Sequence, residues 1–134
     1  MQRRKAREAA LQALFQIDVV QAGGDEAVNY ALTMHDLDKA GEAFCRALVD
    51  GVIANRSEID QTISSWAANW HLDRLANVER NILRIAFYEL LYRTDIPEGV
   101  AISEAVEVAK DFGDDNSGRF VNGILGEFSR SRHK

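Results

Sequence analysis

The segment Trp70–Arg93, WHLDRLANVERNILRIAFYELLYR, carries the densest apolar pattern in the chain and indicates the fold class. Val78, Ile82, Ile85 and Leu90 recur at helical spacing within it. Such spacing places apolar side chains on one face of a helix, as in a core helix of a helical protein. The segment therefore predicts one long helix with an apolar face.

Polar residues mark the ends of this predicted helix and interrupt its apolar face. Asp73 or Asn77 can cap its start, and Pro97, the only proline, ends it. Arg84 and Glu89 lie five residues apart inside the apolar pattern, so they do not share one face well. We expect each of them to form an ion pair with a neighbouring helix.

The rest of the chain is also helical in pattern, without the alternation typical of β-strands. Candidate helices run from Ala6 to Val20, from Asp25 to Met34, from Phe44 to Trp66 with a break near Asn55, from Ser103 to Phe112, and from Asn116 or Ser117 onward. Asp25 and Ser103 are the expected N-caps of their helices. We predict an all-α protein of one domain, with two small helical bundles sharing one core, about residues 1–70 and 71–134.

The composition limits the class of protein. A length of 134 residues suits one domain, and 46% hydrophobic with 28% charged residues is typical of a globular protein. No apolar run approaches the roughly 20 residues that span a bilayer, and no apolar signal segment follows the basic start. Cys45 is the only cysteine, which excludes an intrachain disulfide. These features predict a cytoplasmic protein with no membrane partner.

Catalytic and metal-binding motifs are not found in the sequence. His35, His71 and His133 are scattered, and none has the spacing of a metal ligand to another histidine or cysteine. Asp114 and Asp115 lack the alternating oxygen ligands of a calcium loop. We therefore expect no enzymatic activity, no catalytic residue, no metal and no cofactor.

Basic residues gather at the two ends of an otherwise acidic chain. The ends contain Arg3, Arg4, Lys5, Arg7, Arg130, Arg132 and Lys134, so seven of the 16 basic residues lie within residues 1–7 and 130–134, which contain no acidic residue. The remaining nine basic residues accompany all 21 acidic residues, although the net charge of the whole chain is only −5. Such a polarised distribution is typical of a protein that binds a polyanion through its basic ends, and a merely solubilising terminus is the alternative.

The N-terminal cluster has the residue types that bind single-stranded nucleic acid. At 100° per residue, Arg4, Arg7, Leu11 and Phe15 fall on one helix face. Arginine suits phosphate oxygens, and an aromatic ring can stack on an unpaired base. Positive charges in the first turn oppose the helix dipole, so we expect Arg4 and Arg7 to contribute little to the core.

A second candidate surface surrounds the turn AKDFGDDNSGRF, Ala109–Phe120. Lys110 and Arg119 are basic, and Phe112 and Phe120 lie beside them. Each phenylalanine is either a core residue or a stacking platform, and the helical pattern places Phe120 at the edge of the apolar stripe. We expect Phe120 to be partly exposed near Lys110 and the N-terminal arginines.

Four blocks together resemble the NusB family of bacterial transcription antitermination factors. They are RRKAREAALQALFQID, LVDGV, WHLDRLANVERNILRIAFYELL and DIPEGVAISEAVEVAKDFGDDNSGRFVNGIL, in this order over nearly the whole chain. The resemblance implies two perpendicular three-helix bundles. It also implies binding of single-stranded boxA RNA together with NusE, which is ribosomal protein S10 of the small subunit. That complex joins the RNA polymerase elongation complex and promotes processive transcription of ribosomal RNA operons.

The resemblance also implies site residues, carried over by motif. The RNA-binding residues are Arg3, Arg4, Lys5, Arg7, Phe15, Lys110, Phe112, Asn116, Ser117, Arg119 and Phe120. The protein-partner residues are Asp73, Arg74 and Glu79. The family often has tyrosine where this chain has Phe15, and an acid where it has Asn116. A protein-only interaction module, such as a helical homodimer, is the alternative from a different functional class.

Overall fold

The computed structural model describes residues 3–67 and 75–133, and these residues form seven helices and no strand. The helices are α1 (Arg3–Val20), α2 (Gly24–Thr33), α3 (Lys39–Ala54), α4 (Arg56–Trp66), α5 (Asn77–Tyr92), α6 (Glu98–Phe112) and α7 (Asp115–Arg132). The prediction of an all-α protein is confirmed. Among these described ranges, no helix combines the length and the apolar character needed to cross a membrane.

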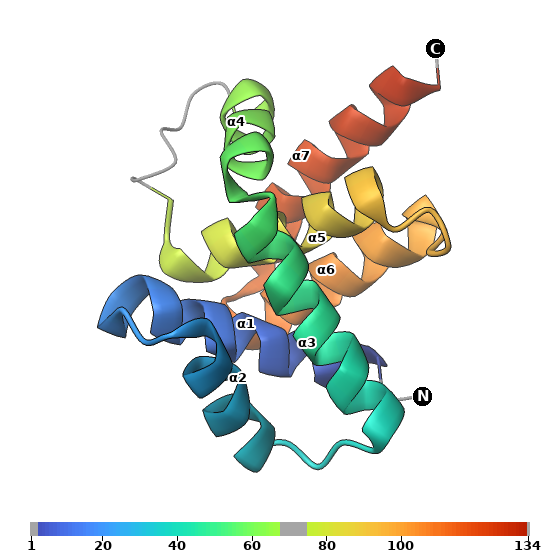
Figure 1. Cartoon of the computed structure of the whole chain (residues 1–134). Helices are drawn as coiled ribbons and strands as arrows, with labels where there is room; N and C mark the ends of the chain where they lie inside the picture. Colours follow the sequence, from blue (N-terminus) through green and yellow to red (C-terminus); the bar gives the residue numbers. More distant parts are fainter. Residues whose placement is uncertain (1–2, 68–74, 134) are drawn as a thin grey trace.

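Helix α5, which the Trp70–Arg93 pattern predicts, lies in the middle of the molecule (Figure 1). Leu83 and Phe87 are fully buried on it, and Ile82 and Leu90 are nearly so. The helix packs against α1, α3, α4, α6 and α7. Its apolar surface is buried on more than one face because five other helices surround it.

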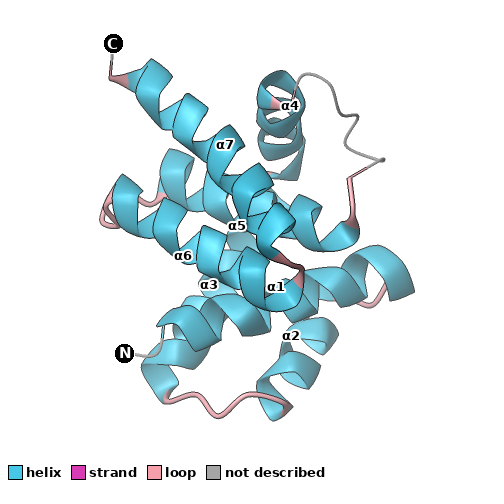
Figure 2. Ribbon diagram, turned by 180° about the vertical axis from the view of Figure 1, so that it is seen from behind, coloured by secondary structure: helices cyan, strands magenta, loops and turns pink. Residues whose placement is uncertain are grey.

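The remaining helices pack around α5 in two groups that share a single core. Helices α1, α2 and α3 pack against one another, and α6 packs along α7 on the other side (Figure 2). Helix α4 packs against α5 and contacts α7, where Trp66 meets the ring of Phe128 edge-on at 5.7 Å. The buried residues of both groups form one continuous cluster, which confirms the shared core. The division near residue 70 stays a prediction.

Three helices begin at residues other than the predicted caps. Helix α5 has Ala76 at its N-cap position and Asn77 as its first residue, so neither Asp73 nor Asn77 caps it. Helix α2 starts at Gly24, with Gly23 at the N-cap position, so Asp25 lies in the first turn. Helix α6 starts at Glu98, more than one turn before Ser103, and Pro97 occupies its N-cap position with φ −59°. Proline suits the start of a helix because its fixed φ is already helical. Pro97 therefore separates α5 from α6 and also occupies the N-cap position of α6.

Candidate nucleic-acid interface

The exposed N-terminal end of α1 lies against α6 and holds Arg4 on the surface. Arg4 Nε donates to Glu104 Oε1 at 3.3 Å, and Arg4 Nη2 donates to Glu104 Oε2. The Arg4 side chain is 47% exposed. The hydrogen bonds from Arg4 hold the pKa of Glu104 below its usual range. The guanidinium of Arg4 is therefore fixed in position while part of it still faces solvent.

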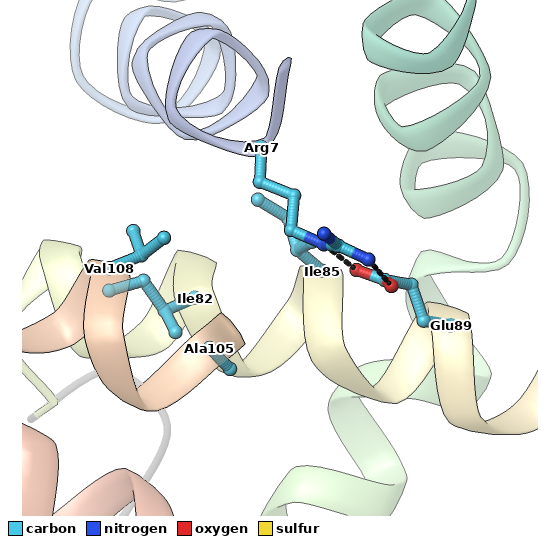
Figure 3. A pocket seen from close by; sticks show the side chains of 6 residues that line it. All are labelled: Arg7, Ile82, Ile85, Glu89, Ala105 and Val108. Atoms are coloured by element: carbon cyan, nitrogen blue, oxygen red, sulfur yellow. Dashed lines mark hydrogen bonds and ion pairs between the residues drawn. The ribbon is translucent and has the colours of Figure 1, made fainter. Parts of the chain in front are cut away.

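Arg7, one turn further along α1, points into the protein instead of toward solvent. Its Nε and Nη2 donate to the two carboxylate oxygens of Glu89 at 2.9 and 2.6 Å (Figure 3). Arg7 is 3% exposed and Glu89 is 1% exposed. The expectation that Arg7 contributes little to the core is wrong, because Arg7 is buried in an ion pair with Glu89 of α5. This partner lies 82 residues away in the sequence, so helical spacing within α1 does not indicate it. The predicted interhelical ion pair of Glu89 is present.

A small cavity lies beside this buried pair, between α1, α5 and α6 (Figure 3). Ile82, Ile85, Ala105 and Val108 line it together with the pair, and its volume is about 10 Å³. A cavity of this size holds at most one water molecule. It therefore offers no space for a ligand. The candidate interface consists of surface residues instead.

The turn between α6 and α7 is organised by hydrogen bonds from Ser117. The backbone N–H of Ser117 donates to Asp114 Oδ1 at 2.8 Å, which caps α7. The hydroxyl of Ser117 lies 3.0 Å from Glu79 Oε1 and 3.2 Å from Asp114 Oδ1, so it can donate to one of these carboxylates at a time. Ser117 is buried. It therefore joins the start of α7 to the first turn of α5.

A cleft of about 410 Å³ opens beside this turn. Its lining residues are Leu75, Ala76, Glu79, Asp114, Asn116, Ser117 and Phe120. Phe120 is partly buried and packs against the core while it also lines the cleft. The predicted partial exposure of Phe120 is confirmed.

The other candidates of the 109–120 segment lie on the surface near the turn between α6 and α7. Lys110, Phe112, Asn116 and Arg119 are all exposed, and Arg119 donates to Asn116 Oδ1. The stem of Lys110 runs along α7, where a Cβ atom at Gly118 would lie 2.8 Å from Lys110 Cγ. The glycine thus allows Lys110 to lie close to the start of α7.

Helix α6 connects the two candidate surfaces. Arg4 is held by Glu104, and Lys110 lies six residues further along the same helix, a separation of about 9 Å along its axis. Arg3 and Lys5 lie beside Arg4 in the first turn of α1, whereas the exposed Phe15 lies three turns further along α1. The first turn of α1 therefore contacts the middle of α6 at Glu104, whereas Lys110 near the end of α6 pairs with Glu107. The candidates Asp73 and Arg74 lie outside the described residues.

The sequence does not indicate that two further residues, Glu104 and Arg93, belong to this surface. Glu104 reads as an ordinary exposed acid of α6, and Arg93 reads as the basic end of α5. Glu104 is revealed only by its contacts with Arg4 and Arg7, and Arg93 by its position over the ring of Phe44 at 5.4 Å. Contacts between residues so far apart in the sequence become visible only in the folded chain.

Comparisons with known proteins agree with this architecture. The model of the NusB family matches residues 4–130. The transcription antitermination protein NusB of Bacillus velezensis is 51% identical over 125 residues, which cover 93% of each chain. A solved structure of T. maritima NusB has a TM-score of 0.88 at 41% identity and covers 97% of this chain and 92% of that chain.

A second solved structure includes other molecules. It is a crystal structure of the antitermination factors NusB and NusE in complex with double-stranded RNA, with a TM-score of 0.88 at 28% identity. The match covers 98% of this chain and 99% of that chain. Transcription antitermination is a regulatory function and not an enzymatic one. From the family match and the identity over most of its length, this chain belongs to the NusB family.

Proposed function

We propose that this protein binds single-stranded boxA RNA together with NusE and promotes processive transcription of ribosomal RNA operons. The proposal places it in the cytoplasm, where it joins the RNA polymerase elongation complex through its partner. The NusB structure with NusE and RNA supports RNA binding with this partner. The preference for single strands and for boxA belongs to the proposal.

The observation that carries the proposal is the cleft beside Phe120. Its side chains can accept hydrogen bonds at Glu79 and Asp114, and the amide of Asn116 can both donate and accept. Two carboxylates disfavour a phosphate in the cleft, since like charges repel. An unpaired base fits this chemistry better, because proteins hydrogen-bond the free edges of unpaired bases and stack their faces on aromatic rings.

The basic side chains around the cleft suit the phosphates of the same strand. Arg119 donates to Asn116 of the cleft, and Lys110 lies against Gly118 at the start of α7. Arg4 and Lys5 are exposed in the first turn of α1. Acidic residues of α6 accompany these cations, since Arg4 pairs with Glu104 and Lys110 with Glu107. One extended strand would place its bases in the cleft and its phosphates against these basic side chains. A duplex would present its bases already paired, so the cleft favours a single strand.

Glu79 is the one candidate for the NusE contact that lies within the described residues. It is partly buried in the first turn of α5 and accepts the hydrogen bond from Ser117. A protein partner seated on the start of α5 would therefore contact the cleft that we assign to RNA. Asp73 and Arg74 precede the same helix in the sequence and remain candidates for this contact.

Phe120→Leu tests the stacking role of the cleft. Leucine keeps most of the apolar contact with the core, so we expect a loss of unfolding free energy below about 1.5 kcal/mol. The loss of the aromatic face is expected to weaken binding of a boxA single strand by about 1–3 kcal/mol. Fluorescence anisotropy gives the affinity, and thermal unfolding gives the stability.

Tyr30→Leu is the matched control, because Tyr30 is an aromatic side chain, 53% exposed, on α2. It should leave RNA affinity unchanged. If Phe120→Leu binds RNA as tightly as the Tyr30→Leu control, Phe120 is a core residue and the cleft holds no stacked base.

A further inference from the structure

Phe44 of α3 forms the centre of a second cationic cluster at the N-terminal end of α1. The guanidinium carbon of Arg3 lies 4.6 Å from the centre of its ring, that of Arg7 5.2 Å and that of Arg93 5.4 Å. Arg7 belongs to the buried pair with Glu89. Arg3 and Arg93 are partly exposed. The ring therefore holds two partly exposed guanidinium groups, one from the start of α1 and one from the end of α5, close to each other.

An anion already occupies the guanidinium of Arg93. Arg93 Nε donates to Asp95 Oδ1 at 2.9 Å and Arg93 Nη2 donates to Asp95 Oδ2 at 3.0 Å. The hydrogen bonds from Arg93 hold the pKa of Asp95 below its usual range, and the charge of Arg3 acts in the same direction. The two parallel bonds have the geometry in which arginine also binds a phosphate.

The Asp95 carboxylate is well placed to be displaced by a stronger anion. It is held by a residue only two positions away in the chain, and its side chain is 55% exposed. An exposed ion pair of this kind contributes little stability. Its release would therefore cost little and would free the two nitrogens of Arg93 that donate to Asp95.

This cluster continues the basic surface that we assign to RNA. Arg3 and Arg4 are adjacent in α1, with Arg3 over Phe44 on one side and Arg4 against Glu104 of α6 on the other. We propose that Arg93, together with Arg3 over Phe44, binds a phosphate of the same RNA strand, and that Asp95 is the internal anion which this phosphate displaces. The inference rests on the proposed function and adds Arg93, Phe44 and Asp95 to its binding surface.

The test uses the full chain without NusE and a boxA single strand as the probe. Each phosphate contact to a single strand contributes about 0.7 to the slope of log K against log salt, which corresponds to about fourfold in affinity at 0.15 M salt. Arg93→Ala is therefore expected to weaken binding by about fourfold and to reduce the slope by about 0.7. Asp95→Asn is expected to tighten binding by about two- to fivefold, since the competing ion pair is removed.

The pair Arg130 and Glu127 on α7 provides the controls. It is an exposed ion pair at 2.5 Å, so Glu127→Gln changes the net charge as Asp95→Asn does and also releases an arginine. Arg130→Ala is the control for Arg93→Ala, because it also removes the arginine of an ion pair. Both controls should change RNA affinity less than the test variants, and thermal unfolding establishes that all four variants are folded.

The outcomes separate this inference from the proposed function. If the wild-type protein binds the boxA single strand neither alone nor together with NusE, both are wrong. If it binds RNA but Arg93→Ala and Asp95→Asn behave as their controls do, only the phosphate site at Phe44 is wrong. If Arg93→Ala weakens association with NusE and leaves RNA affinity intact, the cluster binds a protein partner and the assignment to RNA is overturned.

Discussion

Arg7→Ala is expected to lower the free energy of unfolding by about 3–5 kcal/mol, because it leaves the carboxylate of Glu89 buried without its partner. Both groups are almost completely buried and are joined by two hydrogen bonds. Glu104 lies 3.5 Å from Arg7 and would lose the same cation. Chemical denaturation monitored by circular dichroism measures the change.

Arg4→Ala is the matched control for this prediction. Arg4 lies one turn before Arg7 on the same helix and shares Glu104 with it, but its side chain is 47% exposed. We expect a change within about 0.5 kcal/mol. In the double variant Arg7→Met with Glu89→Leu, both charges are removed together, so much of the lost stability should return. Equal stability of Arg4→Ala and Arg7→Ala would contradict a structural role for Arg7.

Arg84→Ala is expected to cost a similar amount, about 3–5 kcal/mol, because Arg84 joins three helices in a buried network. Arg84 of α5 donates to Asp60 of α4 at 2.8 and 3.1 Å and to Asp18 of α1 at 2.7 Å. Its side chain is 4% exposed, and that of Asp18 is 8% exposed. Removal of the guanidinium leaves two carboxylates close together without this shared cation. The measurement is again the free energy of unfolding.

Arg56→Ala tests whether burial causes this effect. Arg56 contacts the same two carboxylates, Asp18 at 2.9 Å and Asp60 at 3.7 Å, but its side chain is 41% exposed. An exposed ion pair contributes about 0–1 kcal/mol, so the loss should lie in that range. If Arg56→Ala destabilises the protein as strongly as Arg84→Ala, the number of ion pairs matters more than their burial.

The helices could be predicted from the sequence, whereas some of their ends could not. Apolar spacing within each helix is local information, and it indicated α1, α5 and the break between α3 and α4 near Asn55. The sequence pattern places the start of α6 at Ser103 instead of Glu98, because Pro97 also indicates the end of α5. Proline is also accepted at the first positions of a helix, and the pattern alone does not separate these two uses.

The residue types of the candidate site could be predicted from the sequence, but the contacts between those residues could not. The partial exposure of Phe120 followed from its place at the edge of an apolar stripe, which is a property of one helix. The burial of Arg7 depends on Glu89, and the orientation of Arg4 depends on Glu104, 100 residues away. Helical phase places Arg4 and Arg7 on one face, but only the packing of α5 and α6 against α1 separates a surface cation from a buried one.

The central claim is that one surface binds the phosphates and the unpaired bases of a single RNA strand. Titration of the wild-type protein with a boxA single strand at several salt concentrations tests it most directly, with the duplex of the same sequence in parallel. If four to six phosphates are contacted, log K should fall with log salt at a slope of about −3 to −4. The single strand should bind more tightly than the duplex at every salt concentration. An affinity that does not depend on salt, or equal binding of the duplex, would contradict the account.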